Sequence, residues 1–308
     1  MPIPVILDTD IGSDIDDTWA LAQLLRCPEL DLKLVLTATG DVRYRAGLTA
    51  KLLERAGRSD VPVGLGKDFG PMEDKARLQD AWLREYELER YPGKVIEDGV
   101  GALIDIVMNS PVPVTLIAIA PVPNLSLALE REPRIAERCR FVGMHGSIDC
   151  GFAPGSPPGV EYNVKCEIEG FRRVLAAPWQ DLLLTPLDTC ARATLTGDKY
   201  RSVWSRTDDP LVRSVIENYC LWAPRASWFN CDFFATGTST LFDCVAVYLA
   251  YAEDLVEVES LGLSVADDGL TVRDPNGSKV RAAMRWKDLG AFEDHLVQTL
   301  LGSRTRAP

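Results

Sequence analysis

A dense group of carboxylates stands near the start of the chain. Packed carboxylates repel one another, so such a group must either raise its pKa values or bind a cation. Oxygen ligands with no histidine or cysteine nearby favour Ca²⁺ or Mg²⁺ over zinc. We therefore interpret the group as a metal site, whereas any one of its members alone would be interpreted as a solvated helix cap. Five aspartates fall within ten residues: Asp8, Asp10, Asp14, Asp16 and Asp17.

Local sequence patterns place these aspartates where a strand meets a helix. Residues 5–7 form a short apolar run typical of a buried strand. Side chains alternate along a strand, so Asp8 and Asp10 point to the same side, with Asp8 deeper as a partner of the site rather than a ligand. Gly12 permits a turn, and the apolar spacing then predicts a helix over residues 16–25. The acidic pair at the start of that helix is favoured by the helix dipole.

Composition narrows the class of protein. The net charge of −12 argues against nucleic acid or anionic membranes as partners, because both reward basic surfaces. No apolar stretch is long enough to cross a bilayer, and no signal peptide fits before the acidic group, so we expect a cytoplasmic protein. The eight cysteines are scattered without a C-x-x-C pair, which predicts reduced thiols rather than a disulfide framework or a zinc site.

Strand-like and helix-like segments alternate along the first two thirds of the chain. This alternation predicts an α/β fold with a mostly parallel, Rossmann-like sheet flanked by helices. Beyond it, residues 198–251 are expected to be largely helical, and the tail from residue 255 to form short strands and a last helix over 286–301. No linker or repeat interrupts the pattern, so we predict one domain over residues 1–308. The expected strands are 5–7, 32–39, 61–65, 114–120, 140–144 and 182–187, and the expected helices between them are 46–56, 99–109 and 124–130.

Unusual residues follow several of the predicted strands. Ligands of such sheets bind beyond the carboxyl ends of the strands. The acidic group follows the first strand, Asp41 the second, Ile119 ends the fourth and His145 follows the fifth. The Gly/Pro-rich loop 151–159 is expected at the mouth of the same site.

Three further segments complete a recognisable pattern. They are Val-Thr-Leu-Ile-Ala-Ile-Ala-Pro-Val-Pro-Asn at 114–124, Val-Glu-Tyr-Asn at 160–163, and Leu-Phe-Asp-Cys-Val-Ala at 241–246. With the N-terminal D-x-D-x-G-x-D-D-type motif, the chain resembles the inosine–uridine-preferring nucleoside hydrolase family over nearly its whole length. The motif here carries two extra residues. We match the family's adjacent pair to Asp16 and Asp17 because Thr-Trp-Ala-Leu follows in helical register, and this leaves Asp14 without a role.

The resemblance implies a nucleoside hydrolase-like fold and a bound Ca²⁺. The ligands it implies are the carboxylates of Asp10, Asp17 and Asp243 and the backbone carbonyl of Ile119. Asp10 would also act as general base for the water that attacks the anomeric carbon. The transition state would be oxocarbenium-like, so nearby negative charge would stabilise it. Taken alone, Asp243 would be interpreted as a helix cap.

The resemblance also implies residues that bind the ribose. Asp16, Glu161 and Asn163 match family positions that hydrogen-bond the sugar hydroxyls, and Asp41 stands where the family usually has asparagine. Taken alone, Glu161 and Asn163 would be loop residues bonded to backbone groups. Asn124 is interpreted as the cap of the helix that follows it. The family asparagine in the loop before Glu161 has no counterpart that can be aligned.

The chain departs from the family at the residue that protonates the leaving base. A histidine often precedes the last metal aspartate, and here that residue is Phe242. Some relatives stack a purine between aromatic side chains instead, which makes Trp222 and Trp228 candidates, with core packing as their alternative role. His145 is a further candidate, with a structural role as the alternative.

These observations predict a Ca²⁺-dependent N-ribosyl hydrolase that releases free base and ribose, with purine ribonucleosides favoured by the missing acid. One alternative is a hydrolase of another N-ribosyl compound. Another is a catalytically weak ribose- or nucleoside-binding protein. The expected partner is a small ribonucleoside, with neither nucleic acid nor membrane, and the resemblance implies a homo-oligomer, either dimer or tetramer.

Overall fold

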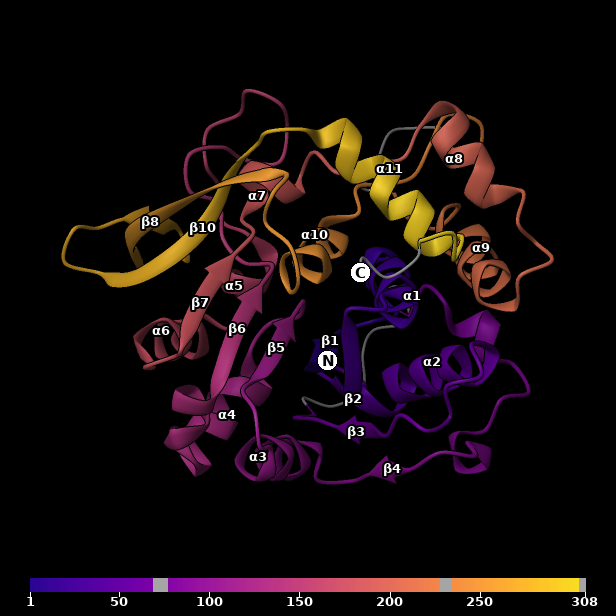
Figure 1. The fold of residues 1–308 in the computed structure, drawn as a ribbon, viewed down its shortest axis with the longest axis horizontal. Coiled ribbons are helices and arrows are strands. Elements are labelled where there is room, and N and C mark those ends of the chain that lie inside the picture. Colours follow the sequence, from indigo (N-terminus) through magenta and orange to yellow (C-terminus); the bar gives the residue numbers. More distant parts are fainter. Residues whose placement is uncertain (69–76, 228–233, 305–308) are drawn as a thin grey trace.

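The computed structural model describes residues 1–68, 77–227 and 234–304 (Figure 1). It contains a single ten-stranded sheet with helices on both faces. The strands are β1 (Ile3–Thr9), β2 (Leu30–Thr37), β3 (Val63–Leu65), β4 (Val95–Ile96), β5 (Val114–Ala118), β6 (Cys139–Gly143), β7 (Asp181–Leu184), β8 (Val256–Val265), β9 (Thr271–Arg273) and β10 (Ser278–Trp286). The helices are α1 (Asp16–Arg26), α2 (Val42–Arg55), α3 (Gly99–Asn109), α4 (Pro123–Arg131), α5 (Tyr162–Cys166), α6 (Ile168–Ala176), α7 (Leu187–Cys190), α8 (Gly197–Trp204), α9 (Pro210–Trp222), α10 (Phe242–Leu249) and α11 (Leu289–Leu300). Short 3₁₀ helices add η2 (Asp80–Leu83), η3 (Leu88–Arg90) and η4 (Pro133–Arg138).

The sheet is parallel except at one edge. Its order is β4-β3-β2-β1-β5-β6-β7-β10-β8-β9, with β8 antiparallel to both of its neighbours. The mostly parallel α/β fold is confirmed, and each of the six predicted strands is present. The tail differs from the expected short strands, because β8 and β10 run for 10 and 9 residues. Oppositely charged side chains on the two strands of this hairpin form ion pairs, as Arg285 and Glu257 do. Such cross-strand pairs stabilise long strands that contribute few residues to the core.

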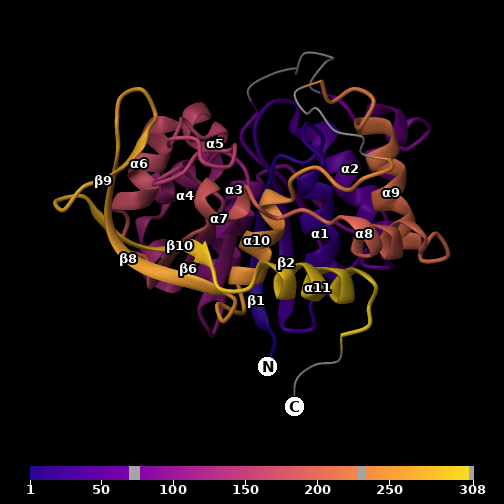
Figure 2. The same cartoon turned by 90° about the horizontal axis from the view of Figure 1, so that it is seen from above.

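Alternate residues of the central strands face two separate hydrophobic layers. Val5 and Leu7 of β1 belong to the layer under α1, α2, α9, α10 and α11, whereas Ile6 belongs to the layer under α3, α4 and α6. Figure 2 shows these two groups of helices on opposite sides of the sheet. A strand covered on both faces needs an unbroken apolar run, which is the pattern that identified β1 in the sequence.

The direction of the chain reverses beside β1. From β1 the chain builds β2, β3 and β4 toward one edge, and it then returns to place β5 on the other side of β1. In open α/β sheets, such a switch leaves a crevice at the carboxyl ends of the two strands that flank it. The aspartate-rich segment follows β1 and therefore opens into this crevice.

Neither membrane-spanning helices nor disulfides are found in the described parts of the chain. No helix in them is long and apolar enough to cross a membrane. The seven cysteines that lie there are all free thiols, as the sequence predicts.

Aromatic side chains hold α9 against α1. Trp222 is 0% exposed, and its ring centroid lies 5.8 Å from that of Tyr219. Tyr219 in turn meets Trp19 edge-on at 6.0 Å. Trp222 is therefore packed in the core, which is the alternative that the sequence left open to stacking on a purine.

We expect Trp222→Ala to lower the free energy of unfolding by about 3–5 kcal/mol, because it leaves a large cavity in this cluster. Denaturant unfolding measures the loss. Phe234→Ala is the matched control, since Phe234 is 48% exposed and its removal leaves no enclosed cavity. Native stability of the Trp222 variant, together with a raised KM for purine nucleosides, would instead support the stacking role.

Candidate functional site

A cavity of about 770 Å³ opens at the carboxyl ends of β1, β5 and β6. This volume is typical of a small-molecule site. Its lining includes seven residues that the sequence singled out, drawn from segments far apart in the chain: Asp10, Asp16, Asp17, Ile119, Glu161, Asn163 and Asp243. The fold thus brings together most of the predicted site.

The local backbone explains how the aspartates reach this cavity. Asp10 directly follows β1, and the chain then turns at Gly12, whose φ of 115° is unfavourable for any residue with a Cβ. A Cβ there would also lie 2.6 Å from the ring of Tyr44. The turn delivers Asp16 and Asp17 to the first turn of α1.

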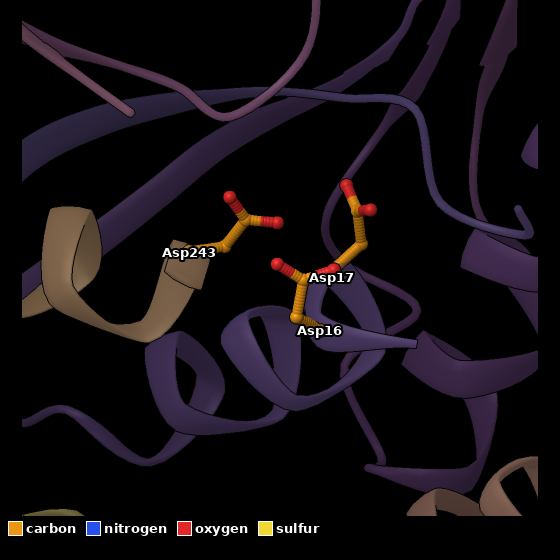
Figure 3. A group of neighbouring side chains, drawn as sticks. All are labelled: Asp16, Asp17 and Asp243. Atoms are coloured by element: carbon orange, nitrogen blue, oxygen red, sulfur yellow. The ribbon is translucent and has the colours of Figure 1, made fainter. Parts of the chain in front are cut away.

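Three carboxyl groups from two helices meet in the cavity. Asp16 and Asp17 start α1, and Asp243 lies in the first turn of α10. Each offers an oxygen within 4.8 Å of the others, and Figure 3 shows the three groups facing a common space. Asp10 also lines the cavity but is outside this closest group. An all-oxygen set of this kind suits a hard divalent cation.

Burial makes this cluster costly without a counter-charge. Desolvation is the largest cause that raises the pKa of Asp10, Asp16, Asp17 and Asp243, and repulsion from neighbouring carboxylates raises it further in the last three. Thr9 donates a hydrogen bond of 2.5 Å to Asp17, and this bond favours the ionised form of Asp17. A bound cation would offset the repulsion directly, so the residues fit a metal site.

Arg45 supplies positive charge beside Asp10. It is 2% exposed, and its Nη2 lies 3.8 Å from Asp10 Oδ2. Its Nη1 donates to the Ile11 carbonyl at 2.9 Å, and its Nε donates to the Thr39 carbonyl at 2.8 Å. Thr39 has a φ of 61°, a strained value for a threonine, and Arg45 therefore braces this turn as well. The sequence interpretation missed Arg45, because its burial in α2 is visible only in the structure.

Asp8 and Asn124 tie together the strands below the cavity. Asn124 Nδ2 donates to Asp8 at 2.7 Å and to the Thr37 carbonyl at 3.1 Å, while its Oδ1 accepts from the Lys67 amide at 2.6 Å. The predicted helix cap is therefore wrong: α4 has Val122 at its cap position without a side-chain bond, and Asn124 lies within the first turn. Burial raises the pKa of Asp8 to about 7. Asp8 lies outside the cavity lining, as the partner that the sequence predicts.

Glu161 and Asn163 hold the opposite wall of the cavity. The Glu161 carboxylate caps α5 by accepting from the amides of Asn163 and Val164, at 2.6 and 3.1 Å, and from Gly146 at 3.1 Å. Burial raises its pKa to about 7 despite these bonds. Asn163 Nδ2 donates to the Met144 carbonyl at 3.0 Å. Both residues therefore bond to backbone groups and line the cavity at the same time.

Three described residues that were predicted to bind substrate are not found in the cavity lining. Asp41 caps α2 by accepting from the Tyr44 amide and pairs with Arg77 at 3.1 Å, so its carboxylate is occupied elsewhere. His145 is 0% exposed, donates from Nε2 to the Ala120 carbonyl at 3.0 Å, and stacks on Phe171. Burial lowers its pKa to about 3, so the structural alternative holds for His145. Trp222 is in the core, and Trp228 lies outside the described residues.

The cavity mouth contains residues that the sequence interpretation did not assign. Phe152, from the Gly/Pro-rich loop, lies 5.8 Å from Phe242 between ring centroids, which agrees with the predicted position of that loop. Tyr162 and Arg225 also line the mouth, as does Asp14 from the two-residue insertion. Tyr162 lies between Glu161 and Asn163 in a recognised motif, and this position could have indicated that it lines the site. Arg225 has no local signal, because only tertiary structure brings the end of α9 to this cavity.

Comparison with known proteins gives a consistent result. The family model for inosine-uridine preferring nucleoside hydrolase matches residues 5–293. The non-specific ribonucleoside hydrolase RihC of Klebsiella pneumoniae is 31% identical over 205 residues, which cover 64% of this chain and 66% of that protein. RihC of Salmonella newport is 32% identical over 203 residues, covering 63% and 64% of the two chains. The matched region thus spans just under two thirds of each relative's length.

Solved structures share the fold across nearly the whole chain. A plant nucleoside hydrolase, PpNRh1, superposes with a TM-score of 0.81 at 21% identity, covering 97% of this chain and 99% of that one. A purine-preferring ribonucleoside hydrolase from Gardnerella vaginalis gives a TM-score of 0.79 at 19% identity, covering 97% and 98%. At these identities the likeness establishes the fold.

The strand clamp is open to a direct test. We expect Asn124→Ala to lower the free energy of unfolding by about 2–3 kcal/mol, because it leaves the buried Asp8 carboxyl and two backbone groups without this partner. Chemical denaturation gives the value. Asn276→Ala, in an exposed turn, is the control. A loss no larger than that of the control would mean that Asn124 does not hold these strands together.

The charge cluster predicts effects of opposite sign with and without a cation. Asp243→Asn keeps the side-chain shape but removes one repelling charge, so without divalent cations we expect its melting temperature to exceed that of the wild type. Ca²⁺ at a hundred times its Kd should stabilise the wild type by about 2.7 kcal/mol, and this gain should shrink in the variant. Asp198→Asn, whose side chain is 97% exposed, serves as control. Equal stabilisation of wild type and Asp243→Asn by Ca²⁺ would remove Asp243 from the ligand set.

Proposed function

Since this chain belongs to the inosine-uridine preferring nucleoside hydrolase family, we propose that it hydrolyses the N-glycosidic bond of ribonucleosides, with Ca²⁺ as its metal and purine nucleosides as its preferred substrates. The products are free base and ribose. The observation that carries the proposal is a cavity whose inner end combines four buried aspartates with a buried glutamate and asparagine. Hydroxyl-rich sugars and hard cations both bind to such oxygen-rich surfaces.

The inner wall provides the ribose contacts. Asp16, Glu161 and Asn163 present carboxylate and amide groups to the cavity from α1 and from the start of α5. Hydrogen bonds from the sugar hydroxyls to these groups orient the anomeric carbon and disfavour sugars that lack the hydroxyls. The backbone bonds of Glu161 and Asn163 keep this wall in place before substrate arrives.

The metal ligands of the proposal are Asp10, Asp17, Asp243 and the carbonyl of Ile119. A divalent cation at such a site binds hydroxyl oxygens and increases the acidity of water beside it. Asp16 is the competing ligand to Asp10, because it lies in the closest carboxylate group. The support for a cation is the burial of like charges that no described cation other than Arg45 approaches closely.

Asp10 acts as general base in this proposal. Its carboxylate accepts the proton of the water that attacks the anomeric carbon. The electron pair of the breaking C–N bond passes to the leaving nucleobase. Desolvation raises the pKa of Asp10, and the nearby charge of Arg45, 3.8 Å from Asp10 Oδ2, opposes that rise and favours the ionised form that accepts a proton. The remaining carboxylates favour the positive charge that develops on the sugar.

The cytoplasmic location and the homo-oligomeric state remain predictions.

The role of Asp10 is tested by Asp10→Asn, which keeps an oxygen ligand and the side-chain volume. We expect kcat for ribonucleosides to fall by about 10²- to 10⁴-fold, because the base is gone while the sugar contacts remain. Release of reducing sugar from a panel of nucleosides measures turnover, and calorimetry measures ribose binding. Wild-type turnover in the variant would exclude Asp10 as the base. Ribose binding by the wild-type protein without turnover on any nucleoside would contradict the proposed function itself.

A further inference from the structure

The two ends of the cavity differ sharply in exposure and polarity. The aspartates at the inner end are at most 6% exposed. Phe152, Val160 and Tyr162 line the outer end and are 46%, 40% and 63% exposed. Large exposed apolar groups around a pocket indicate a binding surface for an apolar, planar ligand part. The base of a nucleoside, held with its ribose at the inner end, would occupy this outer region.

One cation stands in the outer region. Among the described residues that line the cavity, Arg225 carries the only positively charged side chain. It lies in the turn after α9, where its backbone amide donates to the Trp222 carbonyl at 2.9 Å. Its side chain is 37% exposed, which makes it accessible to a ligand.

Arg225 is held by one side of its guanidinium. Nη1 donates to the Leu78 carbonyl at 3.0 Å and to Asp80 Oδ1 at 2.8 Å. Within the described chain these are its side-chain bonds, and neither involves Nε or Nη2. The Nε–Nη2 edge is a planar pair of donors, the arrangement that binds two acceptors side by side.

We propose that this free edge of Arg225 binds the leaving base and selects 6-oxopurine ribonucleosides over adenosine. A 6-oxopurine presents two adjacent acceptors, O6 and N7, which match two parallel N–H donors. Adenine has an amino group, a donor, in place of O6. One N–H of Arg225 would then face an N–H of adenine, and neither could form a hydrogen bond there. The proposal rests on the proposed hydrolase function and names the substrate class of that site.

Arg225 also offers a route around the missing acid. Phe242 cannot donate a proton, and a guanidinium keeps its own. When the C–N bond breaks, its electron pair stays on the purine, and the resulting anionic charge spreads over the ring nitrogens and O6. Two charge-assisted bonds from Arg225 stabilise that anion. Water supplies the hydroxyl that bonds to the anomeric carbon, its proton goes to the general base, and the purine anion takes a proton from solvent after release.

The test compares three variants on inosine, adenosine and p-nitrophenyl riboside. We expect Arg225→Gln to lower kcat/KM for inosine by about 10- to 100-fold while changing adenosine and the activated riboside by less than about threefold. Arg225→Lys keeps the charge but not the paired donors, so an intermediate loss on inosine is expected. Turnover of p-nitrophenyl riboside verifies that each variant is folded.

Asp80→Asn separates substrate binding from a structural role. If Arg225 acts only by holding η2, Asp80→Asn should reproduce the Arg225→Gln losses on all three substrates. If Arg225 binds the base, Asp80→Asn should keep the inosine-to-adenosine ratio within about threefold of the wild type, because the free edge is still present. An unchanged ratio in both Arg225 variants overturns the inference and leaves the hydrolase function standing. Failure of the wild type on all three substrates overturns both.

Discussion

The burial of like charges at the carboxyl end of β1 is the constraint on which the rest of the structure depends. Four aspartates that are 3–6% exposed line one cavity, and their mutual repulsion opposes folding unless positive charge approaches. Arg45 compensates in part, at 3.8 Å from Asp10. The remaining charge would favour a cation bound in this cavity. Binding of a cation would therefore raise the free energy of unfolding of the protein.

Neighbouring elements keep these charges from moving apart. Asn124 links β1, β2 and the segment after β3, so the strand that delivers Asp10 is fixed from below. Gly12 forms a turn that no larger residue could take against Tyr44, and this turn sets the distance from β1 to α1. Aromatic packing around Trp222 fixes the end of α9, and the turn that follows this helix carries Arg225. Groups that would otherwise separate are therefore held in place by polar and apolar contacts outside the cavity.

The cavity divides its chemistry between its ends. Buried carboxylates at the inner end suit a cation and a sugar that becomes positively charged. Exposed aromatic groups and one guanidinium at the outer end suit a planar base that becomes negatively charged. In the proposed reaction, the charges that develop in the transition state would each face the end of the pocket that stabilises them, and a preformed site lowers a barrier in this way.

Local patterns in the sequence predicted most of the helices and strands and the acidic residues that line the inner end of the cavity. The apolar run of β1, the helical register after Asp16 and the alternation of strands and helices are short-range signals, and the structure follows them with shifts of a few residues at the ends. Unusual residue types after predicted strands and family motifs predicted six polar residues that all line the cavity: Asp10, Asp16, Asp17, Glu161, Asn163 and Asp243. Tertiary structure decided the rest. His145 and Trp222 look chemically able in the sequence but are packed in the core, and Arg45 and Arg225 look ordinary there. Whether a side chain faces a cavity depends on how distant elements pack, and no local spacing encodes that.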